Sequence, residues 1–222
     1  MKKSKKALII MIVMLLVVIA SLPFMFTDAS ASIKDNTVEV TNHKKIEIKV
    51  KEKSKNTYET LFIMGDSRSV GMSYIDDSTS HQYTAKVSEG YKYFNNNYEA
   101  VLEKATSKDA IIINFGINDL SNIDKYIELF NKIAKNTKAE IYFLTVNPVD
   151  EEKETKNGYT IKNKDIDTFN EKMIKGLDSK ITVIDSNSIL KEEGFDTTDG
   201  IHFTKDTYKK ILSIIEKQFD NK

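Results

Sequence analysis

The chain of 222 residues contains no cysteine, no tryptophan and only two prolines, and its formal net charge is zero. The lack of cysteine excludes a disulfide framework, a thiolate metal site, a cysteine nucleophile and a lipid-modified cysteine. The balanced charge gives no reason to expect nucleic acid binding. The three histidines form no cluster and the carboxylates have no spacing typical of metal ligands, so we expect neither a metal nor another cofactor.

Apolar residues are concentrated at the N-terminus. Four lysines within residues 2–6 precede an almost uninterrupted apolar run over residues 7–26, an order typical of signal peptides and membrane anchors. Two outcomes remain open, because Ala29-Ser30-Ala31 has the small-x-small form of a cleavage site and the run approaches the ~20 residues that span a bilayer. In either case we expect the rest of the chain to be extracytoplasmic, either secreted or anchored to the cell membrane.

Composition divides the remainder into a spacer and a body. Residues 32–59 are rich in Lys, Asn, Thr and Glu, which favours a solvated polar spacer, although alternation over residues 46–50 would also fit a short exposed strand. From residue 60 to residue 222, apolar segments alternate with helical patterns. The predicted organisation is therefore a signal peptide or membrane anchor (1–31), a polar spacer (32–59) and one α/β domain (60–222).

The body shows the pattern of a parallel α/β sheet. Helices between continuous apolar strands favour a sheet that is covered on both faces, and right-handed crossovers leave few topologies, among them the order 2-1-3-4-5. Strands are predicted at residues 61–64, 85–88, 109–115, 139–146 and 180–185, and helices at residues 69–75, 98–105, 123–135, 166–177 and 205–218.

Short polar motifs follow several of these strands. Gly65-Asp66-Ser67 follows the first strand, Ser88-Glu89-Gly90 the second and Gly116-Ile117-Asn118-Asp119 the third, while Asp199-Gly200-Ile201-His202 opens the final helix. Sites in open parallel sheets form beyond the carboxyl ends of the strands. We therefore expect all four motifs to meet at one edge of the sheet.

Ser67, His202 and Asp199 are the candidates for nucleophilic chemistry. A carboxylate three residues before a histidine can accept from one ring nitrogen and leave the other free to take the serine proton. The alternatives are an ordinary N-cap serine, and a capping aspartate with an incidental histidine. His43 lies in the spacer and His81 in a predicted polar loop, so both are poorer candidates for a base.

Asn118 and Gly90 are candidates for stabilising an oxyanion. The asparagine could donate a side-chain N–H and the glycine a backbone N–H, although a turn rich in Gly, Asn and Asp is a strong alternative for the Asn118 motif. With the strand order 2-1-3-4-5, both residues would flank Ser67, which is where such donors must lie.

Taken together, Gly-Asp-Ser, the glycine after the second strand, Gly-x-Asn-Asp and Asp-x-x-His resemble the SGNH, or GDSL-type, hydrolases over about residues 61–219. The resemblance implies a flavodoxin-like, three-layer α/β/α fold with a five-stranded parallel sheet. It also implies Ser67 as nucleophile, His202 as base and Asp199 as the group that orients the base. We therefore interpret residues 60–222 as an SGNH hydrolase domain.

The same resemblance implies an oxyanion hole formed by the backbone N–H groups of Ser67 and Gly90 together with the Asn118 side chain. The chain departs from the family pattern at two points. Arg68 stands where the GDSL pattern has leucine, and the block around Gly90 matches only loosely.

The implied activity is that of a serine esterase that removes O-acetyl or other short acyl groups from cell-envelope or other carbohydrate. The expected partners are an acylated carbohydrate or another small ester, and the membrane if the N-terminal segment is not cleaved. Two alternatives remain: an acyltransferase that uses the same triad, and a non-catalytic SGNH-like module that binds the envelope.

Three further features lie outside these motifs. The aromatic group of Tyr91, Tyr93, Phe94 and Tyr98 could stack on sugars or belong to the core. Asn147-Pro148 is a turn that could line the site. The charged stretch 151–156 has the composition of a solvated loop.

Overall fold

The computed structural model describes residues 58–219. The predicted signal peptide or anchor and almost all of the predicted spacer lie outside the described residues. Within residues 58–219 no helix combines the length and the apolar character needed to cross a membrane.

The described part is built on a parallel sheet of five strands in the order β2-β1-β3-β4-β5, which confirms the predicted α/β class and strand order. Two of its interior strands, β1 and β3, are buried at every position, as expected for a sheet covered on both faces. The strands are β1 (Leu61–Gly65), β2 (His81–Ala85), β3 (Ala110–Asn114), β4 (Glu140–Leu144) and β5 (Ile181–Ile184).

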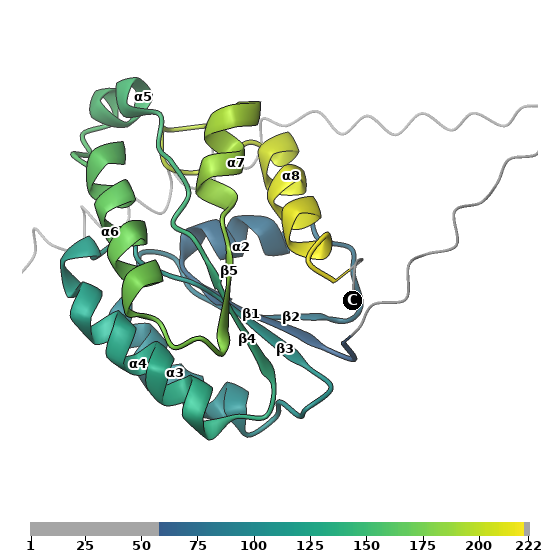
Figure 1. Ribbon diagram of the computed structural model, residues 1–222. Helices are drawn as coiled ribbons and strands as arrows, with labels where there is room; N and C mark the ends of the chain where they lie inside the picture. Colours follow the sequence, from purple (N-terminus) through teal and green to yellow (C-terminus); the bar gives the residue numbers. More distant parts are fainter. Residues whose placement is uncertain (1–57, 220–222) are drawn as a thin grey trace, which may run out of the picture. The chain divides into compact units, whose positions relative to one another are not determined.

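Helices cover both faces of the sheet, which confirms the predicted three layers (Figure 1). One face carries α2 (Ser67–Ser73), α7 (Ser186–Glu193) and α8 (Lys205–Glu216). The other carries α3 (Tyr91–Leu102), α4 (Ile123–Asn136) and α6 (Asn163–Gly176). A short helix, α5 (Glu151–Lys156), and a 3-10 turn, η1 (Leu120–Asn122), lie in loops.

The alternation of side chains along the strands divides the core in two. In β1, Phe62 and Met64 pack into the cluster under α3, α4 and α6, whereas Leu61 and Ile63 pack into the cluster under α2, α7 and α8. This is the two-residue period of a strand that is buried on both sides.

The prediction for the second strand was wrong, since the strand lies at residues 81–85 and not at 85–88. This edge strand is partly exposed and carries polar side chains, so it has no apolar run to mark it. His81 is consequently the first residue of β2 and not part of a polar loop. The loop predicted for residues 151–156 was also wrong, because these residues form α5, with Asp150 as its N-cap.

Candidate active site

Ser67 is the first residue of α2, and only Asp66 separates it from the end of β1. Asp66 is the N-cap of this helix, and its Oδ1 accepts a hydrogen bond from the backbone N–H of Arg68 at 2.9 Å. Ser67 is only 9 % exposed. The tight turn therefore places the serine at the carboxyl end of β1.

The structure brings Ser67, His202 and Asp199 into one hydrogen-bonded chain, which we call the serine relay. Nε2 of His202 lies 2.8 Å from Oγ of Ser67, and Nδ1 of His202 lies 2.6 Å from Oδ2 of Asp199. The second oxygen of Asp199 accepts the backbone N–H groups of Ile201 at 2.9 Å and His202 at 2.7 Å. Both carboxylate oxygens are thus used to orient the imidazole.

The electrostatics of Asp199 suit this arrangement. Burial raises the pKa of its carboxyl group, but hydrogen bonds from the His202 backbone and ring and from Ile201 outweigh burial and hold the pKa below its ordinary value. A charged carboxylate at Nδ1 favours the tautomer with hydrogen on Nδ1, which leaves Nε2 as the acceptor for a serine proton. About a third of the His202 side chain is exposed, so the relay is open to solvent.

Asn118 and Gly90 come from the loops after β3 and β2, the two strands that flank β1. Nδ2 of Asn118 donates to the backbone carbonyl of Glu89 at 2.7 Å, so the amide joins the two loops. An amide nitrogen carries two N–H bonds, and this contact uses one of them. Asn118 is exposed and Gly90 is partly exposed.

Asp119 holds the same two loops together from the inside. Its carboxylate accepts the backbone N–H of Tyr91 at 2.9 Å, the amide of Asn122 at 2.9 Å and the hydroxyl of Tyr126 at 2.7 Å. A Cβ atom added to Gly90 would lie 2.5 Å from this carboxylate. Only glycine fits there without a shift, so packing explains the glycine that the motif contains.

The aromatic group of α3 belongs to the core. Phe94 and Tyr98 are buried, and Tyr91 and Tyr93 are partly buried against the same cluster. Asn147 is likewise buried, and its side-chain oxygen accepts the hydroxyl of Ser186 at 2.6 Å.

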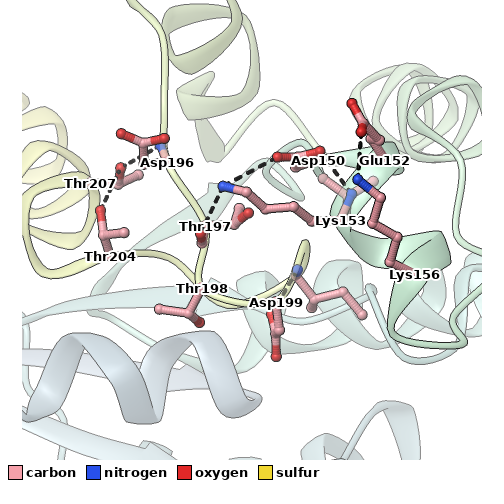
Figure 2. Close-up of polar contacts among 12 residues, drawn as sticks. Asp150, Glu152, Lys153, Lys156, Asp196, Thr197, Thr198, Asp199, Thr204 and Thr207 are labelled. Atoms are coloured by element: carbon pink, nitrogen blue, oxygen red, sulfur yellow. Dashed lines mark hydrogen bonds and ion pairs between the residues drawn. The ribbon is translucent and has the colours of Figure 1, made fainter.

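Sequence reasoning missed the segment after β4 as a support for the relay. Figure 2 shows Lys153 reaching from α5 to the main chain at Thr197, where Nζ donates to the carbonyl at 3.1 Å. Asn157 donates its amide to the carbonyl of Asp199 at 3.0 Å, and the backbone N–H of Asp150 donates to the carbonyl of Gly200 at 2.9 Å. The acceptors are main-chain carbonyls, which every sequence has, so no sequence signal marks these contacts.

Sequence reasoning registered Arg68 only as a departure from the family pattern. Its guanidinium is buried at the centre of the loops behind the site. Burial lowers the pKa of Arg68 to about 10 and raises the pKa of its neighbour Asp66 to about 6, although the Arg68 charge and backbone N–H pull the latter down. A charged arginine on the buried face of a helix is the sequence signal that could have predicted this structural role.

Comparison with known proteins gives a clear result for the fold. No family model matches the chain, and no curated protein matches its sequence. Three solved structures illustrate the similarity, each aligned over 71–73 % of this chain. A GDSL-like lipase from Bacteroides thetaiotaomicron is 18 % identical, with 88 % of its own length covered and a TM-score of 0.58. An acetyl xylan esterase is 15 % identical, with 98 % of its length covered and a TM-score of 0.51. The C-terminal catalytic domain of peptidoglycan O-acetyltransferase A from Streptococcus pneumoniae is 20 % identical, with 90 % of its length covered and a TM-score of 0.52. The described residues therefore have the fold of the GDSL-type lipases and acylhydrolases.

Proposed function

We propose that the chain is an extracytoplasmic serine esterase of SGNH type that removes O-acetyl or other short acyl groups from carbohydrate. The observation that carries this proposal is the serine relay, with its two contacts of 2.8 and 2.6 Å at the carboxyl edge of the sheet. An alcohol activated by an oriented imidazole is the arrangement that acyl transfer requires.

The reaction would proceed in two steps. His202 Nε2 takes the proton of Ser67 as Oγ attacks the acyl carbonyl carbon, and the imidazolium then gives this proton to the leaving alkoxide, which departs as an alcohol. In the second step His202 takes a proton from water, which attacks the acyl-serine, and returns it to Ser67 as the acid is released. Asn118 and the backbone N–H groups of Ser67 and Gly90 would stabilise the oxyanion in both steps.

Labelling with a fluorophosphonate probe tests the nucleophile directly. We expect one stoichiometric adduct on the peptide that contains Ser67, and no adduct in Ser67→Ala. The matched control is Ser107→Ala, which removes an exposed serine in the loop before β3 and should label like the wild type. A folded chain that the probe does not label would instead support a non-catalytic module.

The proposed substrate class is supported by two similar folds, the acetyl xylan esterase and the peptidoglycan O-acetyltransferase domain. The latter also supports a second candidate, transfer of the acyl group to a sugar hydroxyl instead of water. Acetate release from acetylated xylan and acetylated peptidoglycan, measured with and without an unacetylated acceptor glycan, separates the two. An esterase releases acetate at the same rate in both cases, whereas a transferase yields acetylated acceptor.

The proposed location is supported by the basic and apolar N-terminal segment and the small-x-small site that follows it. Expression of the full chain in a bacterial host, followed by fractionation and intact mass measurement, tests it. Cleavage after Ala31 predicts a soluble extracytoplasmic product that begins at Ser32. An uncleaved anchor predicts a membrane-bound product whose body is degraded by protease added from outside the cytoplasm.

A further inference from the structure

Arg68 connects three segments of the chain behind the serine relay. Its Nε donates to the carbonyl of Ile201 at 3.0 Å, Nη1 donates to the carbonyl of Asn147 at 2.8 Å, and Nη2 donates to the carbonyl of Pro148 at 3.3 Å. The residue is 2 % exposed. One side chain at the start of α2 thus binds the loop after β4 and the loop that carries the base.

The contacts of Arg68 lie on both sides of His202 in the sequence. Ile201 comes directly before the histidine, and the guanidinium carbon lies 4.9 Å from the ring centre of Phe203, directly after it. A cation over an aromatic face is an attractive contact, which is stronger when buried. Arg68, the residue directly after the nucleophile, therefore contacts both sequence neighbours of His202.

The loop that carries His202 has an unusual backbone at Gly200, where φ is +99°. A Cβ atom there would lie 2.2 Å from the backbone nitrogen of Glu154 in α5. The loop therefore packs against α5 at Gly200 and contacts Arg68 of α2 at Ile201. It belongs to none of the five strands of the sheet. The loop is closed by its own backbone hydrogen bond from Thr198 N–H to the His202 carbonyl at 2.8 Å, and the Arg68 side chain adds contacts from another segment.

We propose that Arg68 is a positioning residue that holds the His202 imidazole against Ser67. This inference rests on the proposed function and assigns a role to the position where the chain departs from the GDSL pattern. The guanidinium is a rigid planar fork of donors, so it can fix the spacing of two loops. A displacement of about 1 Å between reacting groups can cost ~10²-fold in rate.

Two variants distinguish positioning from a purely electrostatic role. Arg68→Met keeps the length of the stem and removes all donors, and we expect kcat for a small acetyl ester to fall ~10²-fold while KM stays near the wild-type value. Arg68→Lys keeps the buried charge beside Asp66, but a single ammonium cannot bridge both loops. We expect about a tenfold loss of kcat in Arg68→Lys.

The matched control is Asn131→Ala. Asn131 also bridges two segments, donating to the carbonyl of Gly176 at 2.9 Å and accepting from the backbone of Asp178 at 2.7 Å, at the end of the sheet where β5 begins. We expect this variant to lose stability and keep wild-type kcat. Circular dichroism and thermal unfolding identify the temperature at which every variant is folded, and kcat is compared below it.

A readout without turnover separates this proposal from the proposed function. Long-range ¹H–¹⁵N spectra of the imidazoles report the hydrogen bonds of His202, and the chain has only two other histidines to assign. A wild-type chain without activity or probe labelling overturns the esterase, whereas a shifted His202 Nε2 signal in Arg68→Met still supports positioning.

Wild-type kcat in folded Arg68→Met, with unchanged His202 signals, overturns the proposal. Full rescue by Arg68→Lys also overturns it, because charge alone would then account for the effect. If Arg68→Met fails to fold, the kcat of Arg68→Lys and its His202 signals decide the question.

Discussion

The described part of the chain contains two chains of carboxylate, imidazole and hydroxyl, of which only one is a candidate for catalysis. Besides the serine relay, Asp76, His81 and Tyr58 form a second set, which we call the tyrosine relay. In it, Nδ1 of His81 lies 2.7 Å from Oδ2 of Asp76, and Nε2 lies 2.9 Å from the Tyr58 hydroxyl. These distances differ from those of the serine relay by only 0.1 Å at each contact. Hydrogen-bond geometry therefore does not distinguish the two.

Location and exposure do distinguish them. His81 pairs with Leu61 at the start of β1, so the tyrosine relay lies at the amino edge of the sheet, opposite the serine relay. The side chains of His81 and Asp76 are 1 % and 5 % exposed, against about a third for His202 and Asp199. The tyrosine ring also packs edge-on against Phe219, with ring centres 4.5 Å apart. The same chemical groups serve as a buried structural connection in one place and as an accessible candidate site in the other.

The largest expected difference concerns the two hydroxyls. Ser67→Ala should lower kcat for an acetyl ester by up to ~10⁶-fold, since loss of the nucleophile removes the covalent pathway. Tyr58→Phe removes the hydroxyl of the tyrosine relay and keeps its ring, so kcat should stay at the wild-type value. Initial rates with p-nitrophenyl acetate measure both. Near-full activity in Ser67→Ala would show that the site has been assigned to the wrong residue.

The carboxylates give the next comparison. Asp199→Asn should lower kcat by ~10⁴-fold, because an amide at Nδ1 favours the wrong imidazole tautomer. Asp76→Asn should leave kcat unchanged and lower the midpoint of thermal unfolding, because it weakens buried hydrogen bonds from His81 and Tyr83. If Asp76→Asn lost activity as severely as Asp199→Asn, the division of roles between the relays would be wrong.

The sequence pattern predicted the strands that are buried along most of their length. It failed for elements that are polar or partly exposed. β1, β3 and β4 contain apolar runs that any parallel sheet needs, and their order predicted which loops would meet at the carboxyl edge. The strand β2 lies at an edge and is polar, so it was placed four residues too late. The helix α5 was missed because its sequence is almost wholly charged, although Glu154 within it is fully buried.

The candidate site shows the same limit. Ser67, His202 and Asp199 contact each other through side chains, so the residue types in the sequence indicate these contacts. Arg68 contacts main-chain carbonyls of residues 147, 148 and 201. Every residue has such a carbonyl, so the residue types do not indicate these contacts. Similarly, the tyrosine relay was invisible because Tyr58 lies 23 residues before His81, and the two meet only once β2 pairs with β1.

A smaller effect is expected for the oxyanion donor. Asn118→Ala should lower kcat by ~10²–10³-fold with a modest change in KM, because the lost N–H would act mainly in the transition state. The control is Asn136→Ala at the end of α4, where another exposed asparagine donates to a backbone carbonyl at the same distance of 2.7 Å. Equal kcat values for the two variants would remove Asn118 from the oxyanion hole.

The last and smallest effect is a difference in pH dependence between the two regions. Asp76 has a pKa below its ordinary value, because hydrogen bonds from His81, Tyr83 and Ser78 outweigh burial, so its contribution to stability is lost as pH falls through that lowered pKa. Asp66 behaves in the opposite way, since burial raises its pKa to about 6. Stability contributed by its protonated form is complete below the ordinary pKa and is lost as pH rises through about 6.

Chemical denaturation from pH 2 to pH 7, a range that extends below the ordinary pKa of both carboxyl groups, measures this difference with Asp66→Asn and Asp76→Asn. The raised pKa of Asp66 corresponds to ~3 kcal/mol that the wild type loses over this range and Asp66→Asn does not, and asparagine can still cap α2. The free energy of unfolding of Asp66→Asn should therefore gain on the wild type as pH rises. Asp76→Asn should fall behind the wild type at neutral pH and approach it as the solution is acidified. Parallel curves for wild type and Asp66→Asn would mean that the charge beside Ser67 is already compensated by Arg68, and that burial at the serine relay has no net electrostatic cost.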